Sequence, residues 1–175
     1  MIVLGIDPGT ANTGYGVVKG DGGLGLGAVS LVECGVIRTR PRDPLATRLR
    51  DIYEGVVELI ERHRPDTLSV EDVFYAKNVR TTVVLGHARG VVLLAGSRAH
   101  LEIREIPPAE IKKSIVGTGA ATKEQVQFMI TRLLRLKTAP QPADAADGVA
   151  AAIAGLVSTP RAVVAAPRTR HSALR

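Results

Sequence analysis

The fold follows from residues 2–9, which read Ile2-Val3-Leu4-Gly5-Ile6-Asp7-Pro8-Gly9. The unbroken apolar run is typical of a central strand that is buried on both faces. The Asp-Pro-Gly sequence after it predicts a turn that lifts the chain off the sheet. Asp7 is therefore expected at the tip of a buried strand, where its carboxylate reaches one edge of the sheet.

The patterns that follow extend this strand into a sheet with helices. Residues 14–18 and 29–37 alternate as strands do, and Gly-rich turns separate them, which predicts a three-stranded meander. Helical spacing then alternates with short strand patterns. We expect strands at 67–71 and 102–106 and helices at 44–63, 78–99, from Thr122 onward (a capping box with Gln125) and at 142–157.

The order βββ-α-β-α-β-α-α predicts an α/β domain with a five-stranded mixed sheet flanked by helices. A three-stranded meander that leads into a parallel crossover is the pattern of the ribonuclease-H-like fold. We expect one such domain over residues 1–158 and a basic, disordered tail over 159–175. Residues 78–99 are apolar on nearly all faces, so one face is expected on the sheet and the other on a partner subunit.

Length and composition exclude several classes of protein. A chain of 175 residues is too short for a two-lobed enzyme. No apolar run reaches the roughly 20 residues of a membrane helix, so no membrane contact is expected. Cys34 is the single cysteine, which excludes an intramolecular disulfide and a cysteine zinc cluster. With no basic leader before the first strand, these features predict a cytoplasmic location.

The net charge of +6 is unevenly distributed along the chain. Residues 72–137 carry 11 basic against 5 acidic side chains, and residues 161–175 carry 4 against 0, whereas residues 1–71 carry 8 against 10. This distribution is typical of a chain that binds a polyanion beside an acidic site. On charge alone, a solvated surface with an arginine-rich tail explains it equally well.

Four carboxylates are distinguished by their positions. Asp7 and Glu71 each end a predicted strand, and Asp144 and Asp147 lie three residues apart at the start of the last helix, on one face. Taken one at a time they have ordinary explanations, because an aspartate such as Asp7 is common in turns and an acidic residue such as Asp144 suits the dipole at a helix start. If the last helix packs on both strands the four converge, and like charges so close require protons or cations. Two Mg²⁺ ions with carboxylate ligands would suit in-line hydrolysis of a phosphodiester.

Five motifs along the chain are distinctive in combination: Gly5-Ile6-Asp7-Pro8-Gly9-Thr10, Thr13-Gly14-Tyr15-Gly16, Glu71-Asp72-Val73-Phe74-Tyr75-Ala76-Lys77-Asn78, Leu85-Gly86-His87-Ala88-Arg89-Gly90 and Asp144-Ala145-Ala146-Asp147. Together they resemble the RuvC family of Holliday-junction resolvases, and the similarity runs from Met1 to about residue 158. The resemblance implies a magnesium-dependent homodimeric endonuclease of recombination and DNA repair, with Mn²⁺ as a plausible substitute. It implies symmetrical paired nicks in four-way junction DNA that leave 5′-phosphate and 3′-hydroxyl ends. It also implies a branch-migration helicase complex of the RuvA and RuvB type as partner.

The resemblance assigns roles to particular residues. The four carboxylates fall on the family's metal ligands. Phe74 falls on an aromatic residue that stacks on an unpaired base, and Lys77 lies in the same motif as a further DNA contact. Lys112 and Lys123 fall on basic residues that hold phosphate. The sequence departs from the family at Gly148, which costs a helix about 1 kcal/mol, and at Gly155, where many members carry a polar residue.

Parts of the sequence are also compatible with three other functions. The turn after Asp7 also resembles the phosphate loop of actin-like ATPases, but those need a second lobe. An architectural junction-binding protein would gain only repulsion from the four carboxylates. Cleavage of RNA in RNA–DNA hybrids shares the metal chemistry, and only the RuvC-like segments favour junction cleavage over it.

Overall fold

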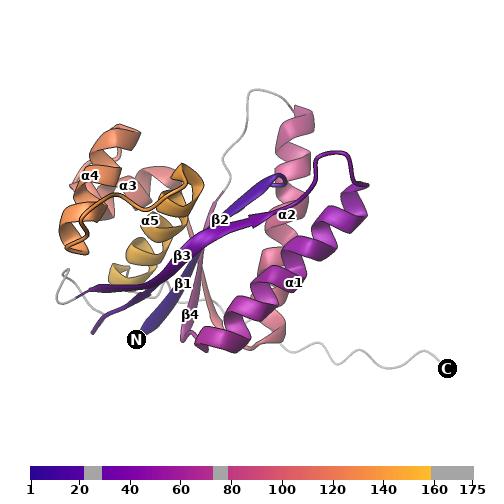
Figure 1. Cartoon of the computed structure of the whole chain (residues 1–175), viewed down its shortest axis with the longest axis horizontal. Helices are drawn as coiled ribbons and strands as arrows, with labels where there is room; N and C mark the ends of the chain where they lie inside the picture. The colour runs from indigo at the N-terminus through magenta and orange to yellow at the C-terminus, as the bar shows by residue number, and fades with distance from the viewer. Residues whose placement is uncertain (22–28, 73–78, 159–175) are drawn as a thin grey trace, which may run out of the picture.

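The computed structural model describes residues 1–21, 29–72 and 79–158, which form one five-stranded sheet with helices on both faces (Figure 1). The strand order is β3-β2-β1-β4-β5. The first three strands pair antiparallel, and β4 and β5 run parallel to β1. The predicted meander and mixed sheet are therefore confirmed. The strands are β1 (Ile2–Asp7), β2 (Asn12–Lys19), β3 (Ser30–Arg38), β4 (Thr67–Glu71) and β5 (Glu102–Ile106).

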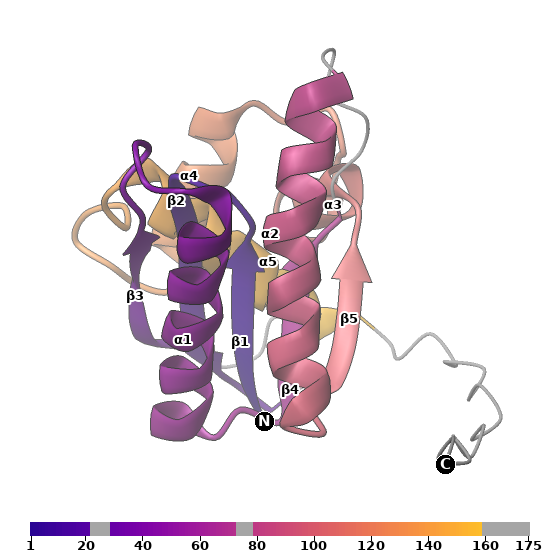
Figure 2. The same ribbon diagram turned by 90° about the vertical axis from the view of Figure 1, so that its right-hand side faces the viewer.

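Helices α1 and α2 cover one face of the sheet, and α3, α4 and α5 lie on the other (Figures 1 and 2). Apolar side chains of α1 and α2 form one buried cluster with the sheet, and those of α3, α4 and α5 form a second cluster on the opposite face. No helix in the described part of the chain is long and apolar enough to span a membrane. The helices are α1 (Leu45–His63), α2 (Val79–Arg98), α3 (Pro108–Val116), α4 (Lys123–Leu133) and α5 (Ala143–Val157).

The predicted order of elements was wrong at one place. The structure has a helix, α3, between β5 and α4, and the predicted order lacks it. Pro107 and Pro108 directly follow the strand predicted at 102–106, and from the sequence they indicate only where that strand stops. In the structure, Pro107 is the N-cap of α3 and Pro108 is its first residue. Proline suits that position, since its missing N–H has no partner in a first turn and its φ is already helical. The capping box of Thr122 and Gln125 at the start of α4 is confirmed.

Helix α5 lies directly against the sheet, as its alanine-rich sequence predicts. A Cβ at Gly148 would collide with the backbone of Tyr15 on β2, and one at Gly155 would collide with the side chain of Ser69 on β4. Ser69 Oγ also donates a hydrogen bond of 2.7 Å to the carbonyl of Ala151. The two glycines that depart from the family pattern thus have a packing role, because they allow the helix to approach the strands closely.

Helix α2 is buried on one face only within the single chain. Its side toward the sheet contains Ala88 and Val92, which are fully buried. On its outer side the exposed fraction is 53% for Val83 and 52% for Leu94. The expectation that one face lies on the sheet is confirmed, and cover of the other face by a second subunit stays a prediction. The tail after residue 158 lies outside the described residues, so the domain boundary there also stays a prediction.

Candidate active site

A cleft of about 230 Å³ lies where β1 and β4 end beside α3, α4 and α5. Asp7 and Glu71 are the last residues of these two strands. Because the strands are paired parallel, with Ile6 opposite Val70, their carboxyl ends meet at one edge of the sheet. The residues that line the cleft are Asp7, Glu71, Pro108, Ile111, Lys112, Lys123, Val126, Asp147 and Ala150.

The first turns of α5 add a third carboxylate to the cleft. Asp147 lines it together with Asp7 and Glu71, whereas Asp144 is not among the lining residues. Asp144 still acts on the site, because its negative charge helps to raise the pKa of Asp7. The backbone of Asp144 packs on Gly14 of β2, where a Cβ would collide with its carbonyl group. The structure thus brings three of the predicted carboxylates together and places the fourth close enough to contribute charge.

The carboxylates raise one another's pKa values. Burial, followed by the charges of Glu71, Asp147 and Asp144, raises the pKa of Asp7 to about 7. Burial and the charge of Asp147 raise the pKa of Glu71 to about 6. Near neutral pH the metal-free site therefore holds protons that a bound cation would displace.

Two lysines offset part of this negative charge. Lys123 Nζ donates a hydrogen bond of 2.6 Å to Asp147 Oδ2, which raises the pKa of the lysine. Its charge also lowers the pKa values of Asp7 and Glu71. Lys112 lies on α3, the helix absent from the predicted order, and lowers the pKa of Glu71. Both lysines lie in the cleft, and their role as phosphate contacts stays a prediction.

The chemistry of the cleft fits a hard divalent cation. Its donors are carboxylate oxygens, which Mg²⁺ and Mn²⁺ prefer. Across the described ranges, no three His, Cys, Asp or Glu side chains are gathered closely enough to hold an ion as they stand. One of the carboxylates, Asp147, is bonded to the ammonium group of Lys123. Asp7, Glu71, Asp144 and Asp147 are the residues that could bind a cation.

Two predicted DNA contacts fall in a part of the chain that the structure does not describe. Phe74 and Lys77 lie within residues 73–78, directly after Asp72. The described strand β4 ends at the cleft with Glu71. The roles of Phe74 and Lys77 stay predictions.

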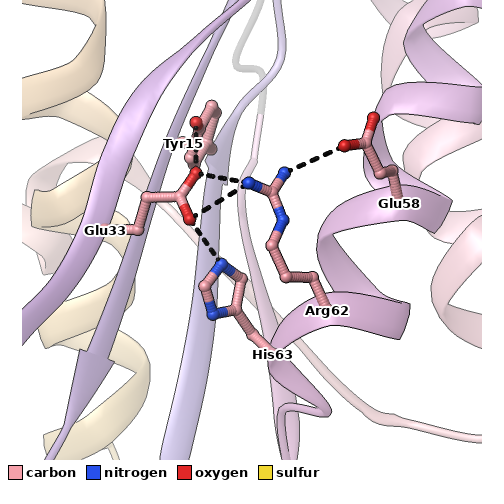
Figure 3. A network of polar contacts seen from close by, with 5 residues as sticks. All are labelled: Tyr15, Glu33, Glu58, Arg62 and His63. Carbon is pink, nitrogen blue, oxygen red and sulfur yellow. Dashed lines mark hydrogen bonds and ion pairs between the residues drawn. The ribbon is translucent and has the colours of Figure 1, made fainter.

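A polar network that the sequence does not indicate links β2 and β3 to α1, on the face of the sheet opposite α5 (Figure 3). Glu33 of β3 accepts a 2.8 Å hydrogen bond from the hydroxyl of Tyr15 and lies 2.7 Å from His63 Nε2. Arg62 Nη1 adds an ion pair of 3.3 Å. Burial opposes ionisation of Glu33, but these partners outweigh it and lower its pKa. The network ties β2 and β3 to α1, and β2 is the strand on which Gly148 of α5 packs.

The fold and the cleft together define a class of protein. A five-stranded mixed sheet in this order, with carboxylates at the ends of β1 and β4 and at the start of a helix packed across them, is the arrangement of a ribonuclease-H-like nuclease. Comparison with known proteins identifies the family. The sequence profile of RuvC, crossover junction endodeoxyribonuclease, matches residues 3–155.

Individual relatives agree with the profile. The chain is 46% identical over 153 residues to a crossover junction endodeoxyribonuclease RuvC from Pelotomaculum thermopropionicum, which covers 87% of this chain and 91% of that protein. It is 49% identical over 156 residues to the RuvC of a Parafrankia species, and the match covers 89% of this chain and 86% of that protein. A solved structure of Thermus thermophilus RuvC in complex with Holliday junction substrate superposes with a TM-score of 0.82 at 35% identity. The superposition covers 88% of this chain and 92% of that one. The chain belongs to the RuvC family of nucleases.

The raised pKa of Asp7 predicts a cost in stability for the metal-free protein. Between the unfolded value of 3.8 and the folded value of about 7 the native state binds more protons, so the free energy of unfolding falls as the pH rises. Asp7→Asn removes that cost. We expect it to raise the free energy of unfolding by more than about 1 kcal/mol at pH 8 and by little at pH 4.

Urea unfolding in EDTA at both pH values measures this effect. Asp21→Asn, at an exposed aspartate, is the matched control and should leave the pH dependence unchanged. An Asp7→Asn variant that is no more stable than the parent at pH 8 would show that the pKa of the Asp7 carboxyl group is not raised in the folded protein.

Proposed function

We propose that the chain resolves four-way (Holliday) DNA junctions by metal-dependent hydrolysis of phosphodiester bonds. Paired symmetrical nicks would leave 5′-phosphate and 3′-hydroxyl ends that can be sealed in recombination and repair. The observation that carries the proposal is the cleft in which three carboxylates and two lysines meet. Membership of the RuvC family and the likeness to a RuvC solved with its junction support the choice of substrate.

The carboxylates are proposed to hold two Mg²⁺ ions, for which Mn²⁺ would substitute. When bound, such ions make water nucleophilic and stabilise the charge on the leaving oxygen. Asp7 and Glu71 supply ligands from the rigid ends of paired strands, and Asp144 and Asp147 supply them from α5.

The two lysines have a separate role in the proposal. Lys112 and Lys123 border the carboxylates and would hold the oxygens of the scissile phosphate. Lys123 also balances part of the charge of Asp147 before a cation and DNA arrive. Phe74 is proposed to stack on an unpaired base near the crossover, and Lys77 to contact the DNA backbone beside it.

A homodimer is proposed because paired nicks need two clefts and the described residues of one chain form one acidic cleft. The exposed apolar side of α2, with Val83 and Leu94, is the surface that a second copy would cover. A RuvA- and RuvB-type helicase complex as partner, and a cytoplasmic location, are proposed from the family resemblance. The single cysteine agrees with a reducing compartment.

Cleavage of synthetic substrates tests the proposed activity. With Mg²⁺, the parent should cut a four-way junction in preference to a linear duplex and an RNA–DNA hybrid. Asp7→Asn should lower the cleavage rate by at least about 100-fold, because a metal ligand is lost, while junction binding in EDTA persists. Asp21→Asn is the control. Preferential cutting of the hybrid would point to a ribonuclease H activity, and parent-like cutting by Asp7→Asn would refute the site.

The dimer is tested by placing charge on the outer side of α2. Val83→Glu combined with Leu94→Glu should give monomers at micromolar concentration in sedimentation, since burying two carboxylates in an apolar interface is unfavourable. The two nicks should then lose their coupling on a supercoiled cruciform. Val32→Glu, at an exposed valine on β3, is the control. A monomeric parent, or coupled nicks in the double variant, would contradict the proposal.

A further inference from the structure

Arg89 on α2 is not among the residues that line the cleft, yet it pairs with two acidic residues, one directly after β4 and one on β5. Its Nη2 lies 3.0 Å from Asp72 Oδ1 and also bonds Glu105 Oε2. Asp72 directly follows Glu71 at the end of β4, and Glu105 lies on β5. From this geometry we infer that Arg89 is a positioning residue, which holds the end of β4 and thereby fixes the carboxylate of Glu71.

The alternation of side chains along the strands places these contacts directly behind the cleft. Val70 belongs to the buried cluster under α1 and α2, and Asp72, two residues on, lies on that same side. Glu71, between them, faces the cleft. Glu105 pairs in register with Val70, so it also lies on the α2 side. Helix α2 runs along this side of β4 and β5 (Figure 2).

Electrostatic repulsion gives Arg89 its role. Asp72 and Glu105 come from neighbouring strands and share a single guanidinium group. Without that group the two carboxylates would repel each other across the β4–β5 pair. The end of β4 is held by the backbone hydrogen bond of 2.9 Å from Asp72 N to the carbonyl of Ile106. On the other face, Asp147 acts on Glu71 with a like charge, so Glu71 experiences a force away from the cleft.

Arg89 differs from an ordinary surface ion pair. Its side chain is 24% exposed, and among the described residues its Nε is buried without a hydrogen-bond partner. Arg50 on α1 also contacts two acidic residues, Asp51 and Glu54, but its side chain is 63% exposed. Exposed pairs of that kind contribute little to stability. The partly buried guanidinium group of Arg89 is therefore better suited than that of Arg50 to hold a fixed geometry, and Arg50 is a matched control.

The inference rests on the proposed function, so the parent chain is measured first. Calorimetry on the DNA-free protein must show that the parent binds Mn²⁺. The parent must also cut a four-way junction in the presence of Mg²⁺. If the parent does neither, the proposed function fails. If it does both, the variants test Arg89 alone.

Arg89→Gln should weaken Mn²⁺ binding and slow single-turnover cleavage by about 10- to 100-fold, the range for residues that orient metal ligands. Junction binding in EDTA should stay within about twofold, because Arg89 is not in the cleft. The sign of the effect is diagnostic. Loss of a positive charge by itself would strengthen the binding of a cation, so Arg50→Gln should leave Mn²⁺ affinity unchanged or slightly higher.

A second variant removes the repulsion as well as the arginine. Arg89→Gln combined with Glu105→Gln should fold even where the single variant does not, and should bind Mn²⁺ within about threefold of the parent. Mn²⁺ affinity of Arg89→Gln equal to that of the parent would overturn the inference. So would a folded double variant that still binds Mn²⁺ more than tenfold more weakly.

Discussion

Repulsion between carboxylates at the ends of β1 and β4 is the constraint on which the rest of the structure depends. Asp7, Glu71 and Asp147 share a cleft of about 230 Å³, and burial combined with like charge raises the pKa of Asp7 to about 7. An arrangement of this kind opposes folding unless protons or cations neutralise it. The repulsion that costs stability also favours the binding of a cation, and nucleases of the RuvC family are metal-dependent.

The surrounding structure holds these groups together from several directions. Parallel pairing fixes the two strand ends side by side, and Gly148 lets α5 approach β2 closely enough to bring Asp147 into the cleft. Lys123 balances part of the charge from within the cleft. On the opposite face, the Glu33 network ties β2 to α1, and α2 contacts the end of β4. Ion pairs on the face of the sheet opposite the cleft thus connect its strands to α1 and α2.

Local patterns in the sequence predicted most of the fold, and distant contacts account for what they missed. The strand that ends in Asp7 and the capping box at Thr122 rest on neighbours in sequence, and both are confirmed. Helix α3 was missed because proline both ends strands and begins helices, and only packing decides between them. Glu33 pairs with Tyr15 and His63, which lie 18 and 30 positions away along the chain, and no periodic pattern in the sequence indicates such contacts. Gly148 was likewise seen only as a helix breaker, because the strand it contacts is remote in sequence.

Proton release on metal binding tests the central claim most directly. Titration of the DNA-free protein with Mn²⁺ by calorimetry, in buffers of different ionisation enthalpy, counts the protons displaced. With Asp7 titrating near 7 and Glu71 near 6, binding should release about one proton at pH 6.5 and almost none at pH 8.5. Binding that releases no proton at pH 6.5, or no binding at either pH, would contradict a cation site built from mutually repelling carboxylates.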